Sequence, residues 1–150
     1  MRELILMRHA EALPAAIDSE DFARPLSEAG RNAASRAARQ LASGPGIDRV
    51  LHSPARRTSE TARIVAAELA LPPQLLEPVP ELYLATPRRV REAIAAHHGG
   101  ARTLLVIGHN PSLSELGGEL ERRHRHEHLA TAAFWRLPFA AEAWRELTGS

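Results

Sequence analysis

Leu4-Ile5-Leu6-Met7-Arg8-His9 and Leu104-Leu105-Val106-Ile107-Gly108-His109 are the two stretches that decide the fold, because each is a short apolar run that ends on a histidine. Short apolar runs bounded by polar residues or glycine are typical of buried strands in an α/β sheet. In such sheets, ligands bind beyond the carboxyl ends of the strands. The two imidazoles, far apart in sequence, can therefore meet at one edge of the sheet.

Further patterns extend this arrangement along the chain. Strands are expected at residues 3–7, 49–52, 103–107, 131–137 and, on a weaker pattern, 143–147. Helical patterns with capping residues lie between them, over residues 27–42, 58–69, 86–97 and from Asn110-Pro111 through Leu120. The alternation predicts an α/β fold, a three-layer α/β/α sandwich with a mostly parallel central sheet and helices on both faces. The irregular stretch over residues 12–25 can form the rim of a site.

Composition bounds the class of protein. Residues 1–150 fit one domain, which is large enough to bury a hydrophobic core without the help of disulfides or a structural metal. The chain has no cysteine, which excludes disulfides, a thiol nucleophile and a thiolate metal site. The net charge of +1 is too small to indicate electrostatic binding to nucleic acid or to a membrane surface. No apolar stretch approaches the roughly 20 residues of a membrane span. The N-terminus leads into a strand without the pattern of a signal peptide, so a cytoplasmic protein is expected.

The basic residues are informative in a second way. All 19 are arginine and lysine is absent, which excludes Schiff-base and P-loop lysine chemistry. Arginine stays charged and binds phosphate in a bidentate fork. Because alanine is also abundant, the same bias fits genomic base composition.

The first candidate cluster is Arg8-His9, at the end of the first expected strand. A neutral imidazole can attack phosphorus and form a phosphohistidine intermediate. For that purpose its other nitrogen is held as N–H, usually by a backbone carbonyl. The neighbouring Arg8 would bind the equatorial oxygens. Taken alone, an Arg-His pair after a strand also fits a solvated turn.

The second cluster, Leu51-His52-Ser53-Pro54-Ala55-Arg56-Arg57-Thr58, follows the second strand and leads into a helix. Arg57 falls in or just before the first turn, where its guanidinium and the free backbone N–H groups can bind one anion. Arg56 points elsewhere and is expected to face solvent. His109 completes the set as a hydrogen-bond donor to a phosphoryl oxygen. Two histidines, arginines and a helix N-terminus at one sheet edge suit an anionic phosphoryl group.

Three segments carry a resemblance to a known family: Arg8-His9-Ala10, Ser53-Pro54-Ala55-Arg56-Arg57-Thr58 with Thr61-Ala62 after it, and Gly108-His109-Asn110-Pro111. In this order and at strand ends they resemble the histidine phosphatase superfamily, also called phosphoglycerate mutase-like, and in particular its short SixA-type branch of phosphohistidine phosphatases. Arg24-Pro25-Leu26-Ser27-Glu28-Ala29-Gly30 and Pro80-Glu81-Leu82-Tyr83 are similar to two further elements of that branch. The chain departs from the superfamily at Ala10, where glycine is usual.

The resemblance implies roles for individual residues. His9 would be the nucleophile, and Arg8, Arg57 and His109 would form the phosphate pocket. Arg24 would be an additional phosphate ligand. No metal and no other cofactor is implied.

The general acid is a separate question. Larger members of the superfamily use a carboxylic acid to protonate the leaving oxygen. Glu81 is the positional candidate, and an ordinary loop carboxylate is the alternative reading. A phosphohistidine substrate has less need of an acid, because its N–P bond breaks readily once the leaving imidazole is protonated.

A histidine-rich run, Arg122-Arg123-His124-Arg125-His126-Glu127-His128, offers a different chemistry. Imidazole clusters bind zinc or nickel. The interleaved arginines would repel a dication, and the spacing matches no closed site. A solvated basic loop is therefore favoured, which can rim the site and attract an anionic partner.

These observations favour a cofactor-independent phosphohydrolase that acts through a phosphohistidine intermediate. With 150 residues, the chain has room for only a minimal lid, which suits phosphohistidine presented by another protein, such as a histidine phosphotransfer domain. A small-molecule phosphomonoesterase of the same superfamily is the alternative, and a non-catalytic phospho-binding module is the second. We expect a monomer that binds neither nucleic acid nor membranes.

Overall fold

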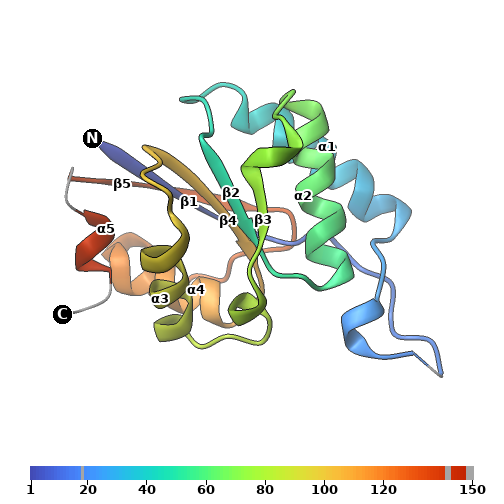
Figure 1. Ribbon diagram of the computed structural model, residues 1–150. Coiled ribbons are helices and arrows are strands. Elements are labelled where there is room, and N and C mark those ends of the chain that lie inside the picture. The colour runs from blue at the N-terminus through green and yellow to red at the C-terminus, as the bar shows by residue number, and fades with distance from the viewer. Residues whose placement is uncertain (18, 141–142, 148–150) are drawn as a thin grey trace.

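The computed structural model describes residues 1–17, 19–140 and 143–147 and is built on one five-stranded sheet (Figure 1). The strands lie in the order β3-β2-β4-β1-β5. Their bounds are β1 Arg2–Arg8, β2 Arg49–His52, β3 Leu76–Pro78, β4 Thr103–Gly108 and β5 Phe134–Phe139. The first four are parallel to one another, and β5 runs antiparallel beside β1. The expected mostly parallel sheet is therefore confirmed.

Helices cover both faces of this sheet (Figure 1). On one face lie α1 (Glu28–Leu41) and α2 (Arg56–Glu68), and on the other lie α3 (Pro87–His97), α4 (Ser112–Leu120) and the short α5 (Ala143–Glu146). Side chains of β1 alternate between two cores: Leu4 and Leu6 pack with the α3–α4 side, whereas Ile5 and Met7 pack with the α1–α2 side. Strands buried on both faces in this way explain why the sequence shows continuous apolar runs. The three-layer sandwich is confirmed.

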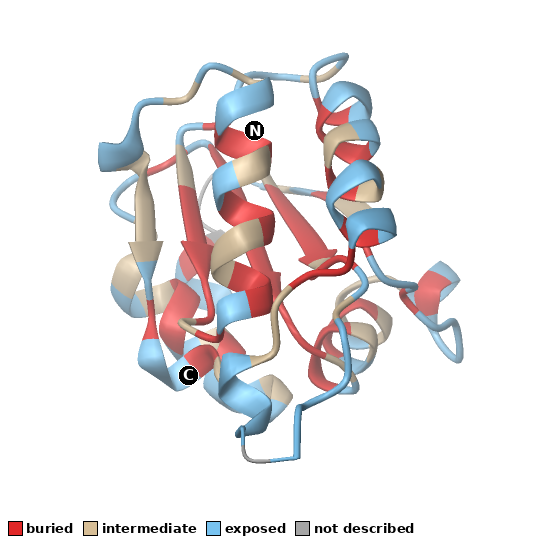
Figure 2. Ribbon diagram, turned by 90° about the vertical axis from the view of Figure 1, so that its right-hand side faces the viewer, coloured by how far each residue is buried: buried red, intermediate tan, exposed pale blue. Residues whose placement is uncertain are grey.

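The helix ends follow local chemistry. The Ser27 hydroxyl accepts a hydrogen bond from the Gly30 N–H at the start of α1, and Thr86 does the same for Arg89 at the start of α3. Each such cap satisfies one of the free N–H groups of the first turn and contributes about 1 kcal/mol. Figure 2 shows the pattern of burial in the folded chain, with the inner faces of the helices and the central strands buried.

Several element boundaries differ from the expectation. Residues 143–147, predicted as a strand, contain α5 instead, where the Trp144 indole N–H donates to the Ala101 carbonyl in the core. The last strand begins at Phe134 rather than Thr131, because Ala132 has a positive φ and its N–H donates to the carbonyls of Arg8 and His9. β3 was missed, since it is only three residues long.

Two helices also begin at other residues than predicted. α2 starts at Arg56, without a side-chain cap. α4 starts at Ser112, and Pro111 precedes it instead of occupying its first turn. Asn110 Oδ1 accepts hydrogen bonds from the Ser114 N–H and hydroxyl and thereby still satisfies a donor of that turn. Within the described residues, no helix is long and apolar enough to cross a membrane.

Candidate active site

The two histidines meet at the carboxyl ends of β1 and β4. These neighbouring parallel strands pair Arg8 with Gly108, and the His9 N–H donates to the Gly108 carbonyl at 3.1 Å. The register therefore places the next residue of each strand side by side, and the His9 and His109 rings lie 5.3 Å apart. A depression of about 350 Å³ at this edge is lined by the five predicted phosphate-site residues, Arg8, His9, Arg24, Arg57 and His109.

His9 is held in one tautomer. Its Nδ1 lies 2.7 Å from the Ala10 carbonyl, which can only accept, so Nδ1 carries the proton and Nε2 carries a lone pair. Nε2 in turn accepts from Arg57 Nε at 3.4 Å. Burial lowers the pKa of His9 to about 4, with further lowering by the charges of Arg57, Arg8 and Arg24. The imidazole is therefore neutral near pH 7, as nucleophilic attack requires.

His109 has the opposite tautomer. Its Nδ1 accepts from Arg57 Nη2 at 3.3 Å, so its Nε2 carries the proton and donates to Ser53 Oγ at 2.8 Å. Burial, followed by the charge of Arg57, lowers its pKa to about 3. Ser53 directly follows β2, is fully buried and orients this ring, a role that its place in the second motif alone does not predict.

Arg57 lies in the first turn of α2 and is buried, with 5% of its surface exposed. Its neighbour Arg56 is exposed and pairs with Glu60 at 3.1 Å. Successive helical residues point about 100° apart, so only one of the two arginines can face the depression. The sequence assigned that place to Arg57, where the structure also puts it.

Arg8 contributes a donor that has no hydrogen-bond partner among the residues that the structure describes. Its Nε is buried and makes no hydrogen bond, while its Nη1 lies 3.3 Å from His128 Nε2. Burial, and then the charge of Arg57, lowers the pKa of Arg8. A buried N–H without an acceptor is costly, and other atoms of Arg8 line the depression.

The loop after β1 adds groups that sequence reasoning missed. The Asp21 carboxylate accepts from Arg24 Nη1 at 3.0 Å, from Arg57 Nη2 at 3.1 Å and from the Tyr83 hydroxyl at 2.8 Å. These hydrogen bonds, that of Tyr83 first, lower the pKa of Asp21 to about 2. The Tyr83 ring lies 5.6 Å from the His109 ring. An acidic residue in a long loop carries no pattern that would have identified it.

Glu81 lies elsewhere. It is exposed on a short 3₁₀ turn, Pro80–Leu82, and lines a different depression together with Arg89, Glu92 and His97. The structure thus does not bring Glu81 into the depression that holds His9, and the general-acid role is without positional support.

The histidine-rich run is not uniformly solvated, which corrects the expectation. His124 is buried and stacks on Trp135, with ring centroids 4.1 Å apart. His126 and His128 are exposed. Among residues 1–17, 19–140 and 143–147, no group of three or more His, Cys, Asp or Glu could hold a metal ion. His128 lies 3.3 Å from Arg8, a residue that lines the depression, so that a role of this run at the rim of the site stays a prediction.

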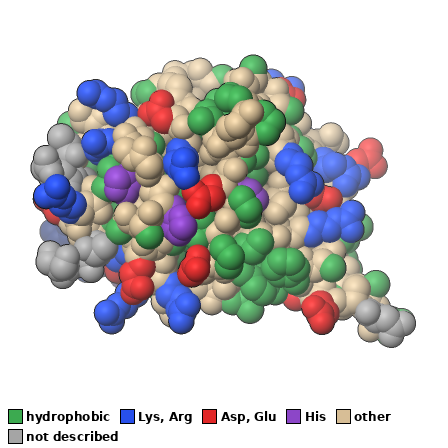
Figure 3. All heavy atoms as spheres, viewed as in Figure 1, with side chains coloured by type: hydrophobic (Ala, Val, Ile, Leu, Met, Phe, Trp, Pro, Cys, Tyr) green, Lys and Arg blue, Asp and Glu red, His purple; other side chains and the backbone are tan. Residues whose placement is uncertain are grey.

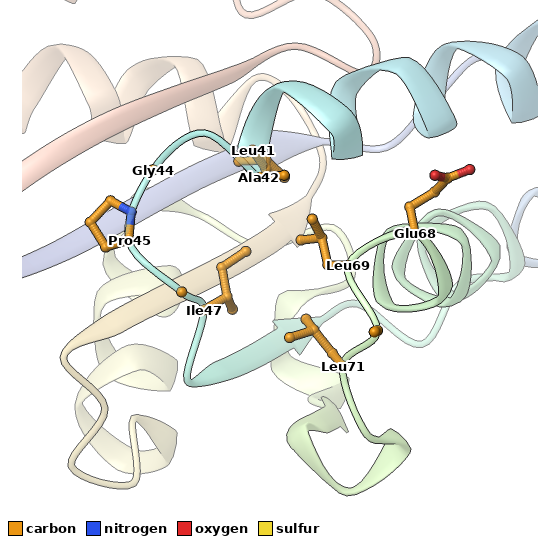
Figure 4. Close-up of a pocket in the computed structure, with 10 residues that line it drawn as sticks. Leu41, Ala42, Gly44, Pro45, Ile47, Glu68, Leu69 and Leu71 are labelled. Atoms are coloured by element: carbon orange, nitrogen blue, oxygen red, sulfur yellow. The ribbon is translucent and has the colours of Figure 1, made fainter.

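A second depression has a different character. It lies beside the amino end of β2, where Leu41, Ile47, Leu69 and Leu71 converge (Figure 4). Its only charged lining residue among those described is Glu68. On the face that Figure 3 shows, basic side chains are interspersed with acidic and apolar ones. Arg8, His9, Arg57 and His109, by contrast, line one depression at the carboxyl edge of the sheet.

Comparisons with known proteins agree with this geometry. The family model of the histidine phosphatase superfamily (branch 1) matches residues 4–86. The solved protein histidine phosphatase SixA in complex with tungstate is similar at a TM-score of 0.81 and 29% identity, over 93% of this chain and 90% of that one. A protein from Nakamurella multipartitia that is assigned as SixA gives 0.77 and 28%, over 99% and 90%.

More distant structures share the fold alone. The α-ribazole phosphatase from Shigella flexneri has a TM-score of 0.66 and 19% identity, over 89% of each chain. No curated protein matches by sequence.

Proposed function

The chain belongs to the histidine phosphatase superfamily, branch 1, and on that premise we propose that it is a phosphohydrolase that acts through a phosphohistidine at His9. One observation carries the proposal. The unprotonated Nε2 of His9 lies beside Arg57 Nε at a depression that Arg8, Arg24 and His109 also line, so that a nucleophilic nitrogen and the groups that bind an oxyanion meet at one place.

The reaction would have two displacements. His9 Nε2 attacks phosphorus and the bond from phosphorus to the leaving group breaks, so that the leaving group departs and takes up a proton. Water then attacks the phosphoryl group on His9, phosphate is released and the Nε2 lone pair is restored. The sum is hydrolysis of one phosphoryl bond by one water molecule. Arg8 and Arg57, with Arg24 at the edge, would stabilise charge on the transferring group.

His109 needs a proton before it can donate to that group. In the structure its Nδ1 accepts a hydrogen bond from Arg57. A bound phosphoryl dianion favours the charged form of a neighbouring imidazole. We therefore propose that His109 takes up a proton at Nδ1 when the substrate binds, while its Nε2–H stays on Ser53.

The proposed substrate is phosphohistidine carried by another protein. Leu84, which lines the depression, is 72% exposed, and Leu13 and Phe22 on the neighbouring loop are exposed as well. Exposed apolar side chains beside a phosphoryl pocket suit contact with a protein surface. The likeness to the protein histidine phosphatase SixA supports the same substrate.

The test compares substrates on the same preparation. We expect kcat/KM for a phosphorylated histidine phosphotransfer domain to exceed that for p-nitrophenyl phosphate by at least about tenfold. EDTA should leave both rates unchanged, because arginines supply the positive charge. Faster hydrolysis of a small phosphomonoester would favour the small-molecule alternative. Phosphoryl binding without turnover would favour a binding module.

A further inference from the structure

Arg57 presents two edges of its guanidinium to two different sets of partners. Nε and Nη2 form the edge that faces the imidazoles, where they donate to His9 Nε2 and His109 Nδ1. Nη1 and Nη2 form the other edge, where they donate to the Asp21 carbonyl at 2.9 Å and to Asp21 Oδ2 at 3.1 Å. A planar guanidinium cannot turn one edge without turning the other. The orientation of the edge at the two histidines is therefore tied to Asp21.

We propose that Asp21 is a positioning residue for phosphoryl transfer, which acts by holding the outer edge of Arg57 so that the inner edge points at the phosphoryl site. This inference rests on the proposed function. It deepens that function by assigning a role to Asp21 in the loop at residues 12–25, of which the sequence analysis singled out only Arg24.

Asp21 is itself held in place by two further groups. Its Oδ2 also accepts from the Tyr83 hydroxyl, and its Oδ1 accepts from Arg24, which is anchored by a hydrogen bond from its Nε to the Leu13 carbonyl at 2.8 Å. The carboxylate thus links α2, the loop and the segment that carries Tyr83. Hydrogen bonds to a charged group are roughly twice as strong as neutral ones, so this network can fix a side chain that is 46% exposed.

A carboxylate that is hydrogen-bonded to a phosphate-binding arginine can have a different effect, which is to compete with the phosphoryl group for the N–H donors of that arginine. The geometry argues against competition. The Arg57 donors that face His9 and His109 are not the Nη1–H and Nη2–H directed at Asp21, so an oxyanion between the imidazoles can bind without displacing the carboxylate. The two effects have opposite signs, because loss of a positioning residue weakens oxyanion binding whereas loss of a competitor strengthens it.

Tungstate binding measured by calorimetry separates these outcomes and needs no turnover. We expect Asp21→Ala to weaken tungstate binding by at least about tenfold, and Asp21→Asn, which keeps an acceptor oxygen but not the charge, to fall between Asp21→Ala and the unchanged protein. The matched control is Glu20→Gln, which removes a carboxylate from the same loop one residue away. Stronger or unchanged tungstate binding in Asp21→Ala would overturn the proposal, as would an equal loss in Glu20→Gln.

Turnover and spectroscopy supply the second readout. A positioning role predicts that kcat falls by more than KM rises in Asp21→Asn, and that the Arg57 Nε–H resonance shifts toward that of a solvated arginine. An unshifted resonance would overturn the proposal. If the unchanged protein binds tungstate but turns over no phosphoryl substrate, the proposed function fails while the tungstate series still decides the role of Asp21. If the unchanged protein does not bind tungstate, both proposals fail.

Discussion

The strand ends and the loop after β1 contribute to the same depression in different ways. His9 and His109 are fixed by the register of β1 and β4, and both are more than nine-tenths buried. Asp21, in the loop, is half-exposed, and its carboxylate accepts hydrogen bonds from Arg24, Arg57 and Tyr83. The strand register therefore places the two imidazoles, whereas the loop contacts the Arg57 cation beside them.

The electrostatic effects of the two regions also differ. At the strand ends, burial lowers the pKa values of His9 and His109 to about 4 and about 3 and keeps both imidazoles neutral. In the loop, hydrogen bonds lower the pKa of Asp21 to about 2 and keep the carboxylate charged. The neutral imidazole of His9 thus lies beside the Arg57 cation, whose opposite edge is held by the Asp21 carboxylate.

The strongest test of this division removes the nucleophile. We expect His9→Ala to lower turnover of a phosphohistidine domain by more than about a thousandfold, because the covalent route is lost. His126→Asn is the control, since His126 is exposed and has a positive φ that asparagine tolerates. The unchanged enzyme, quenched at alkaline pH during turnover, should carry phosphate on His9 by mass spectrometry. Turnover retained in His9→Ala would exclude His9 as the nucleophile.

The two adjacent arginines at the start of α2 test whether their positions on the helix decide which of them binds the phosphoryl group. Arg57→Ala should lower kcat/KM by about a hundredfold, the effect of losing one preorganised donor to a transferring phosphoryl group. Arg56→Ala removes an exposed i,i+4 pair with Glu60 and should change kcat/KM less than about twofold. Equal losses in the two variants would contradict the assignment of Arg57 to the inner face of α2.

The buried imidazoles also predict how stability depends on pH. The folded pKa of His9 is about 4, below the unfolded value of 6.5, so the unfolded chain binds more protons between these values. Stability should therefore fall as the pH decreases through this range. Replacing His9 by Asn should reduce the loss of unfolding free energy between about pH 7 and pH 5 by up to about 2 kcal/mol. Denaturant titrations at both pH values would measure it, and an unchanged pH dependence would contradict a depressed His9 pKa.

The strand ends could be predicted from the sequence, whereas the contacts of the loop after β1 could not. The apolar runs of β1 and β4 and the caps at Ser27 and Thr86 are local patterns, and they predicted the layers and the strand-end residues. Asp21 could not be predicted, because its role depends on where a long loop meets α2. The error at residues 143–147 has a similar cause, since Trp144 fits a strand pattern but its indole N–H finds a partner only in the folded core.

Replacement of Glu81 is expected to have the smallest effect on activity. It tests whether the segment after β3 takes part in catalysis or has only a structural role. Glu81 lines another depression, whereas Tyr83, two residues later, contacts Asp21. Glu81→Gln should therefore change kcat/KM less than about twofold for both a phosphohistidine domain and p-nitrophenyl phosphate, since a group that cannot reach the leaving atom cannot act as its acid. The matched control is Glu92→Gln, which lines the same depression as Glu81. A loss confined to Glu81→Gln and to p-nitrophenyl phosphate, whose oxygen leaving group has the greater need of a proton, would restore Glu81 as the general acid and require the segment to move when substrate binds.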